Sequence, residues 1–449
     1  MKKFASFMLV LCFALTLNAQ QARKDLKINR CMSASNYYDY PGPRQKTYTP
    51  APAGYKPFYL SHYGRHGSRY LIGDAAYDWP YFTLLKADSL NELTPKGEEL
   101  LKKLGIIRNE ARNREGELTL LGAQQHKNIA RRMYENFPQI FAGKTNVDAK
   151  STIVIRCILS MENALQQLLI ENPQLQIRHD ASMHDMYYMN FSDEALFKQR
   201  YSGNTKSVWE AFQKKHDHYD RVMREIFKDD DYWQHHVDAS RLNRNLFSLA
   251  GIIQDTDLRN SISLYDLFND DEIYNDWLLN NAYYYINYGA CPLNGGNQPY
   301  SQRNLLRNII HQADSCIVLR HPGVTLRFGH DTMVMPLTCL LDLDGFGLQE
   351  SDLEKLPEEG WCDYKIFPMA CNIQFVFYRR YVGDKDILFK VLFNENEATL
   401  PIKTDRAPYY HWKDFRAYYL KKLNAYDQKG SFYKVGFLTI LLCFRNKVA

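Results

Sequence analysis

The stretch FYLSHYGRHGSRY, residues 58–70, joins an apolar run to a turn rich in glycine and positive charge. Residues 58–63 are mostly aromatic or aliphatic, which predicts a buried β-strand. Gly64 and Gly67 follow this run, and glycine lets the backbone approach a ligand closely. Because open α/β folds bind ligands at the carboxyl ends of their strands, we expect a functional site at this turn.

Two arginines flank a histidine in the same turn. Arg65 and Arg69 each offer a rigid fork of donors that suits phosphate or carboxylate, and they would repel each other without a shared anion. The positive neighbours disfavour the protonated form of His66, which leaves a neutral ring nitrogen available as a nucleophile. The alternative is a surface turn with solvated charges. An isolated RHG tripeptide would favour that alternative, but the preceding strand and Arg69 favour an anion site.

A second strand-like run ends in the same way. Residues 324–328, VTLRF, precede Gly329, His330 and Asp331, and the segment that follows has a helical pattern. Asp331 is the acid that a phosphohistidine route needs to protonate the departing alcohol, and His330 can donate to a phosphate oxygen. Aspartate is also an ordinary helix cap, so this pair alone is weak evidence.

Strand-like and helix-like segments alternate at both ends of the chain but not in its middle. Runs such as CIVLRH at 316–321 and IQFVFYRRY at 373–381 favour strands, whereas residues 192–307 are polar, tyrosine-rich and helical in spacing. We predict an α/β fold with a mainly parallel sheet flanked by helices. Residues 20–191 and 308–449 would form the α/β catalytic domain, and 192–307 an inserted, mostly α-helical second domain.

The first 19 residues, MKKFASFMLVLCFALTLNA, are typical of a signal peptide, with a short basic start, an apolar stretch and a final alanine. We therefore expect an exported protein. The short basic start favours a bacterial source and a periplasmic or outer-surface location, and a eukaryotic secretory route is the alternative.

Composition excludes several classes of partner. The 449 residues carry a formal net charge of +5, which is too mild for a nucleic-acid or membrane-surface protein. Eight cysteines follow the signal peptide with no CxxC spacing, so disulfides are permitted but their pairing is open. The apolar run at 435–444 is too short to cross a bilayer, and we expect a buried C-terminal strand there. Oligomeric state cannot be read from these patterns.

Three other motifs are assigned to structure rather than to chemistry. AGKT at 142–145 lacks the first glycine of a nucleotide-binding loop. His216, Asp217 and His218, with two further histidines at 235 and 236, could be drawn as a metal site, but a solvated helix face is the better interpretation and we expect no metal. His62 lacks the glycine and arginine frame, so we assign it to packing or to hydrogen bonding behind the site.

Four segments together resemble the histidine acid phosphatases, the second branch of the histidine phosphatase superfamily, and within it the phytase and multiple inositol polyphosphate phosphatase group. They are RHGSR at 65–69, GELTLLGAQQH at 116–126, STIVIRCILSMENAL at 151–165 and FGHDT at 328–332. The resemblance implies a phosphoglycerate-mutase-like fold. It also implies a third phosphate-binding arginine, Arg156, followed by Ser160. Strand propensity at 153–155 would place Arg156 at a strand end, whereas the resemblance favours a helix start; the alternative role is an exposed arginine paired with a carboxylate.

The chain departs from the family pattern at two places. Leu71 and Ile72 stand where proline commonly follows the second arginine. HDT replaces the HAE of the inositol polyphosphate phosphatase group, which places the proton donor at Asp331, as in the acid phosphatases and phytases.

The function implied is the hydrolysis of phosphate monoesters, with phytate or other inositol polyphosphates as the expected substrates. His66 would attack phosphorus and Asp331 would protonate the leaving oxygen, without a metal or other cofactor. The phosphate would be clamped by Arg65, Arg69, Arg156 and His330. An unperturbed aspartate titrates near about 3.9, so an acidic optimum is expected. The alternatives are a general acid phosphatase on sugar or other small esters, a non-catalytic protein that binds anionic ligands, and a mutase of the first branch.

Overall fold

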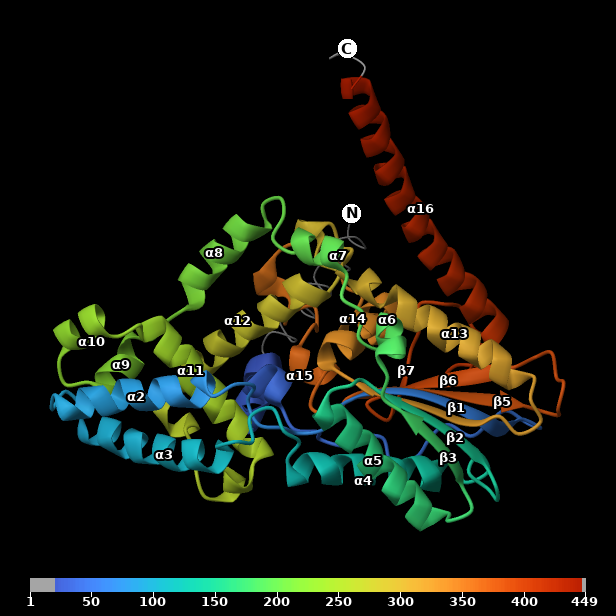
Figure 1. Cartoon of the computed structure of the whole chain (residues 1–449), viewed down its shortest axis with the longest axis horizontal. Helices are drawn as coiled ribbons and strands as arrows, with labels where there is room; N and C mark the ends of the chain where they lie inside the picture. Colours follow the sequence, from blue (N-terminus) through green and yellow to red (C-terminus); the bar gives the residue numbers. More distant parts are fainter. Residues whose placement is uncertain (1–20, 446–449) are drawn as a thin grey trace, which may run out of the picture.

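The computed structural model describes the backbone of residues 21–445 and the side chains of residues 21–428. The expected signal peptide, residues 1–19, lies outside the described residues. Figure 1 shows a sheet with helices on both faces and a group of helices beside it. The predicted α/β class is confirmed.

The sheet is mixed, with strand order β3-β2-β4-β1-β5-β6-β7 and β8 paired to β6. β3, β2, β4 and β1 pair parallel in that order, whereas β1 pairs antiparallel with β5 and the pairings among β5 to β8 are antiparallel. Four of the seven pairings are antiparallel, where the sequence predicted a mainly parallel sheet. The strands are β1 (Lys56–Arg65), β2 (Asn146–Ser151), β3 (Gln176–Asp180), β4 (Gly323–Gly329), β5 (Asn372–Arg379), β6 (Leu388–Phe393), β7 (Asn396–Ala398) and β8 (Tyr410–His411).

Each face of the sheet buries its own apolar cluster against helices. Along β1, Leu60 packs toward α4 (Leu120–Asn136) and α5 (Ile155–Glu171), whereas Tyr59 and Tyr63 belong to the cluster on the opposite face. This alternation follows from the two-residue period of a strand. The helices of the opposite face are α13 (Arg303–Ile317), α14 (Asp331–Leu341) and the first part of α16 (Trp412–Arg445).

A third apolar cluster forms the core of the group of helices beside the sheet. Leu100, Leu104, Ile226 and Leu246 are buried in it. Its helices are α2 (Ala75–Ser89), α3 (Pro95–Ala111), α9 (Asp220–Ile226), α10 (Asp230–His236) and α11 (Ala239–Ile252). Two of these helices, α2 and α3, precede the predicted insertion at 192–307 in the chain, so this core is built from two separate segments.

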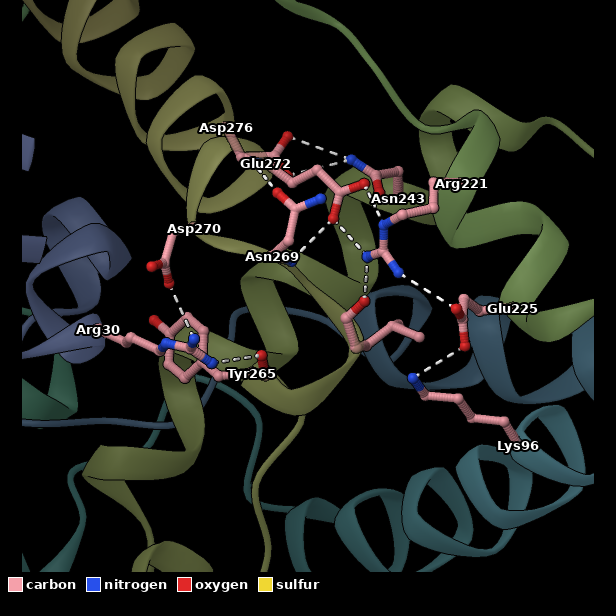
Figure 2. Close-up of polar contacts among 11 residues, drawn as sticks. Arg30, Lys96, Arg221, Glu225, Asn243, Tyr265, Asn269, Asp270, Glu272 and Asp276 are labelled. Carbon is pink, nitrogen blue, oxygen red and sulfur yellow. Dashed lines mark hydrogen bonds and ion pairs between the residues drawn. The ribbon is translucent and has the colours of Figure 1, made fainter. Parts of the chain in front are cut away.

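An ion pair joins these two segments. Lys96 of α3 pairs with Glu225 of α9 at 3.0 Å across the two segments (Figure 2). Within the second segment, Arg221 of α9 pairs with Glu272 at the start of α12 (Asp270–Tyr288). Asn269 caps α12 through a capping box with Glu272, which satisfies backbone donors at its first turn. The remaining α-helices are α6 (Met186–Met189), α7 (Glu194–Gln199), α8 (Thr205–His216) and α15 (Asp363–Ile366).

The C-terminal run is helical, so the prediction of a strand at 435–444 is wrong. It continues α16, whose first turns place Trp412, Phe415, Tyr419 and Leu423 at helical spacing in the core. A ten-residue apolar run does not distinguish helix from strand by itself, and the helical pattern lies upstream of it. In Figure 1, α16 extends away from the sheet.

Within the described residues, no helix is long and apolar enough to cross a membrane. Seven cysteines in this part of the chain are free, and six of them are buried. The eighth, Cys443, lies beyond the described side chains.

Candidate active site

The carboxyl ends of β1 and β4 lie side by side and bring the two histidines together. Arg65 is in register with Gly329. The backbone N–H of His66 donates to the Gly329 carbonyl at 2.9 Å, and the rings of His66 and His330 lie 5.7 Å apart between centroids. The expectation that both strand ends contribute to one site matches this geometry.

His66 is 1% exposed and is held in one orientation. Its Nδ1 lies 2.8 Å from the carbonyl oxygen of Gly67. A carbonyl only accepts hydrogen bonds, so Nδ1 carries the proton and Nε2 keeps a free lone pair. Burial, followed by the charges of Arg65 and Arg69, holds the pKa of His66 well below its ordinary value. The ring is therefore neutral, and Nε2 is the nitrogen available to attack an electrophile.

Three guanidinium groups surround this ring with unused donors. Arg65 is fully buried and donates from Nη1 to the Phe367 carbonyl at 2.9 Å. Arg69 donates from Nη1 to the carbonyl of Tyr70 at 2.8 Å. Arg156 lies in the first turn of α5, as the resemblance favoured, and not at a strand end. The Nε of each of these three arginines is buried and has no hydrogen-bond partner among the described residues.

Unpaired buried donors are costly, and three in one place indicate an anion-binding site. The charges are also close enough to act on each other, since burial and then Arg69 lower the pKa of Arg156. Burial, followed by Arg156, lowers the pKa of His330 to about 4. An anion bound here would complete the donors' hydrogen bonds and relieve this repulsion.

Asp331 is the first residue of α14 and faces the same group. Its Oδ2 lies 3.2 Å from Nη2 of Arg65, and its Oδ1 accepts from the backbone N–H of Thr332. Burial acts to raise the pKa of Asp331, but the charges of Arg65 and Arg69 outweigh it and the pKa is lowered. The sixth predicted residue, His330, contacts Thr152 Oγ1 from Nε2 at 3.2 Å. All six predicted residues thus meet at the ends of β1 and β4.

A model of the histidine phosphatase superfamily (branch 2) matches residues 64–394. The chain belongs to this family. The resemblance drawn from the sequence motifs is confirmed, and so is the class of activity, because histidine phosphatases of this branch are hydrolases that act on phosphate monoesters.

Solved histidine phosphatases share the fold. The multiple inositol polyphosphate phosphatase of Bifidobacterium longum, in complex with inositol hexasulfate, has a TM-score of 0.71 at 20% identity, over 85% of this chain and 96% of that chain. The phytase from D. castellii has a TM-score of 0.63 at 13% identity, over 88% and 85%. Hafnia alvei phytase in complex with tartrate has 0.51 at 14%, over 83% and 98%. At these identities the likeness concerns the fold alone. Among curated proteins, none matches the chain.

Residues behind the histidine phosphatase motif hold its loop in place. The hydroxyl of Ser68 donates to Oδ1 of Asp255 at 2.5 Å, and Gln125 of α4 bonds both the backbone and the hydroxyl of Ser68. Burial raises the pKa of Asp255 well above its ordinary value. Asp255 was not predicted from the sequence, because it comes from the helical region and no local motif marks it.

Close packing against the backbone of α4 also fixes this loop. A Cβ on Gly67 would collide with the backbone of Gly122, and a Cβ on Gly122 would collide with the backbone of Ser68. Ser160 Oγ accepts from the Gly67 N–H at 3.1 Å and donates to the carbonyl of Arg156 at 2.8 Å. The GELTLLGAQQH segment therefore supports the loop from outside the anion site.

Of the two other histidine assignments made from the sequence, that of His62 agrees with the structure and that of His216 does not. His62 is buried against Phe328, as expected for packing. His216 is not on a solvated face: it lies between Asn275 at 3.0 Å and Glu354 at 2.8 Å, since a helix of the insertion packs inward there. In the described part of the chain, no group of histidine, cysteine and carboxylate residues could hold a metal ion.

Proposed function

We propose that this histidine phosphatase is an exported enzyme that hydrolyses inositol polyphosphates such as phytate through a phosphohistidine intermediate. One observation carries the chemistry: a neutral, buried His66 with a free Nε2 stands among three arginines whose buried Nε donors lack partners. A phosphate ester supplies both the electrophile for that nitrogen and the acceptors for those donors.

The first step forms a bond between Nε2 of His66 and phosphorus while the bond from phosphorus to the ester oxygen breaks. Asp331, protonated, gives its proton to the departing alkoxide, which leaves as an alcohol. Arg65, Arg69 and Arg156 stabilise the charge on the equatorial oxygens, because their donors are already oriented and buried.

The second step returns the enzyme to its starting state. Water attacks phosphorus, Asp331 accepts the proton of that water, and the bond from phosphorus to Nε2 breaks. Inorganic phosphate leaves and Nε2 regains its lone pair. Asp331, protonated by the attacking water, loses that proton to solvent in the free enzyme and takes one up again when the next substrate binds the arginines.

Two lines of support favour inositol polyphosphates and export. The family likeness includes a multiple inositol polyphosphate phosphatase and two phytases, by their own descriptions. The N-terminal 19 residues have the pattern of a signal peptide. A general acid phosphatase acting on sugar phosphates uses the same anion site, and the choice of substrate separates the two.

The test is inorganic phosphate release from p-nitrophenyl phosphate and from phytate at pH 4 to 7 with EDTA present. Wild type is compared with His66→Ala and with His184→Ala, which removes an exposed histidine outside the site. We expect turnover by wild type and His184→Ala, and none by folded His66→Ala. Preference for phytate supports the inositol polyphosphate assignment, and preference for small esters supports a general phosphatase.

A protein that binds anions without turning them over is the remaining candidate. In that case wild type and His66→Ala would both bind phytate in calorimetry and neither would release phosphate. That outcome would assign the arginines to binding and overturn the catalytic roles of His66 and Asp331.

A further inference from the structure

A cavity of about 210 Å³ opens beside the start of α14, next to the proposed catalytic acid. Thr332 and Met333, the two residues after Asp331, form one wall. Other parts of the wall come from α7 and from the short helix η7 (Gln298–Gln302), which packs against both α7 and α14. The cavity is large enough for several water molecules or for a ligand group of comparable size.

Arg200, at the carboxyl end of α7, brings a positive charge to this cavity. Its guanidinium carbon lies 4.7 Å from the ring centre of Phe197 and 4.5 Å from that of Tyr288. Stacking against these two rings positions the guanidinium beside the cavity. The Nε of Arg200 is buried without a hydrogen-bond partner, and none of the ion pairs among the described side chains includes Arg200.

The other charges of the cavity wall are already satisfied. Asp193 pairs with Arg303 at 2.6 Å and caps the first turn of α7 through two backbone N–H groups. The remaining polar lining is neutral and consists of hydroxyl and amide groups: Asn190, Ser192, Gln298, Ser301, Gln302 and Thr332. One free positive charge among neutral donors and acceptors suits an anionic group carried on a polyhydroxylated ring.

The cavity is built in advance of any ligand. Asn294 donates to the backbone carbonyl of Arg200 at 3.1 Å, and Gln298 donates to that of Leu196 at 2.8 Å, so α7 is fixed to the distant segment 294–298. Thr332 and Met333 directly follow Asp331 and line the cavity together with Arg200 and Tyr288. Arg200 therefore offers a second cationic position beside the catalytic group.

We infer that Arg200 binds a second phosphate group of the same substrate molecule while the first lies against His66, so that the cavity selects polyphosphorylated ring polyols over monophosphates. This inference rests on the proposed phosphatase function and adds a specificity-determining residue to it.

The test is the ratio of kcat/KM for phytate to kcat/KM for p-nitrophenyl phosphate, which has a single phosphate. Arg200→Gln should lower this ratio at least about tenfold, mainly through KM for phytate, because a charge-assisted contact is lost. Arg200→Lys should recover part of it. Lys198→Ala removes an equal charge from an exposed position two residues away and should leave the ratio at the wild-type value.

A second variant covers the case in which Arg200→Gln does not fold. Ser192→Trp fills the cavity from an exposed position and should lower the ratio in the same way. An unchanged ratio in a folded Arg200 or Ser192 variant overturns the inference while leaving the phosphatase function intact. If wild type releases no phosphate at all, the proposed function fails, and calorimetric binding of inositol hexasulfate then tests Arg200: equal affinity in wild type and Arg200→Gln overturns its role.

Discussion

Asp331 Oδ2 lies 3.2 Å from Nη2 of Arg65, so the proposed proton donor rests against a guanidinium that the substrate phosphate is expected to bind. In the free protein this arrangement keeps the carboxyl ionised, since the arginine charges lower the pKa of Asp331. A bound phosphate brings negative charge to the same arginines and weakens their hold on Asp331. Substrate binding thus converts Asp331 from an ion-pair partner into an acid.

This exchange predicts a difference between two pH profiles. Activity should fall as pH rises, because Asp331 must be protonated to act as the acid. The pH profile of kcat/KM reports the pKa of Asp331 in the free enzyme, whereas the profile of kcat reports its pKa in the enzyme–substrate complex. We expect the pKa of this falling limb to be higher in kcat than in kcat/KM. The pKa values of the substrate phosphates are measured separately by phosphorus NMR, and their contribution is subtracted from both pH profiles. Equal pKa values in the two profiles would show that bound substrate does not weaken the effect of the arginine charges on the pKa of Asp331.

Removing the acid should matter most when the leaving group needs a proton. We expect Asp331→Asn to lower kcat for phytate by at least about a hundredfold. The loss for p-nitrophenyl phosphate should be much smaller, because nitrophenolate departs without protonation. Steady-state phosphate release with both substrates measures this. Equal losses for the two would assign Asp331 to binding rather than to proton transfer.

The site was largely predictable because its residues lie in two short local patterns. Arg65, His66 and Arg69 follow one strand and His330 and Asp331 follow another, and parallel strands bring such ends together. Arg156 required the family resemblance, because its β-branched neighbours favour a strand whereas α5 begins there. Asp255 and Arg200 come from the helical region, and only tertiary packing shows that they reach the site.

The fold was predictable in class but not in its pairing. Short apolar runs are ambiguous, and CIVLRH at 316–321, expected as a strand, instead ends α13 and forms the turn before β4. The helices α2 and α3 share the core of the helical region because their apolar faces meet α9 and α11, a contact between distant segments that no local spacing reveals.

The contact between the catalytic loop and α4 predicts a sharp difference between two glycines. Gly122→Ala would place a methyl group into the backbone of Ser68, so activity should fall strongly and the free energy of unfolding by several kcal/mol. Gly105→Ala in α3 meets only an ordinary contact and should stabilise the helix by about 0.5–1 kcal/mol. Urea denaturation of both variants measures these changes. Loss of stability in both glycine variants, or in neither of them, would contradict the close contact between Gly122 and the backbone of Ser68.

A buried carboxyl in the helical region predicts a pH dependence of stability. Asp276 accepts hydrogen bonds from Asn243 at 3.1 and 3.2 Å (Figure 2), and burial raises its pKa to about 8. The unfolded value is about 3.9, so the folded state binds the proton more tightly. Its stabilising contribution is complete below the unfolded pKa and is lost as pH rises from about 4 to about 8.

Asp276→Asn replaces the neutral acid with an amide of the same shape and should remove this loss. We expect the drop in free energy of unfolding between pH 5 and pH 8 to be smaller in Asp276→Asn than in wild type by a few kcal/mol, on the order set by the pKa shift. Asp231→Asn, on the exposed side of α10, should retain the wild-type drop. A drop in Asp276→Asn equal to that of wild type would show that Asp276 is ionised in the fold.

The position of β4 between β2 and β1 also has a consequence for how the protein is made. A growing chain holds β1 and β2 long before the strand that joins them exists, and the carbonyl that receives the N–H of His66 arrives only with Gly329. The central pairing is therefore of long sequence separation, which slows folding. Chains truncated before residue 329 should contain no working site, and a polypeptide that completes its sheet this late remains uncommitted to its native structure for most of its synthesis.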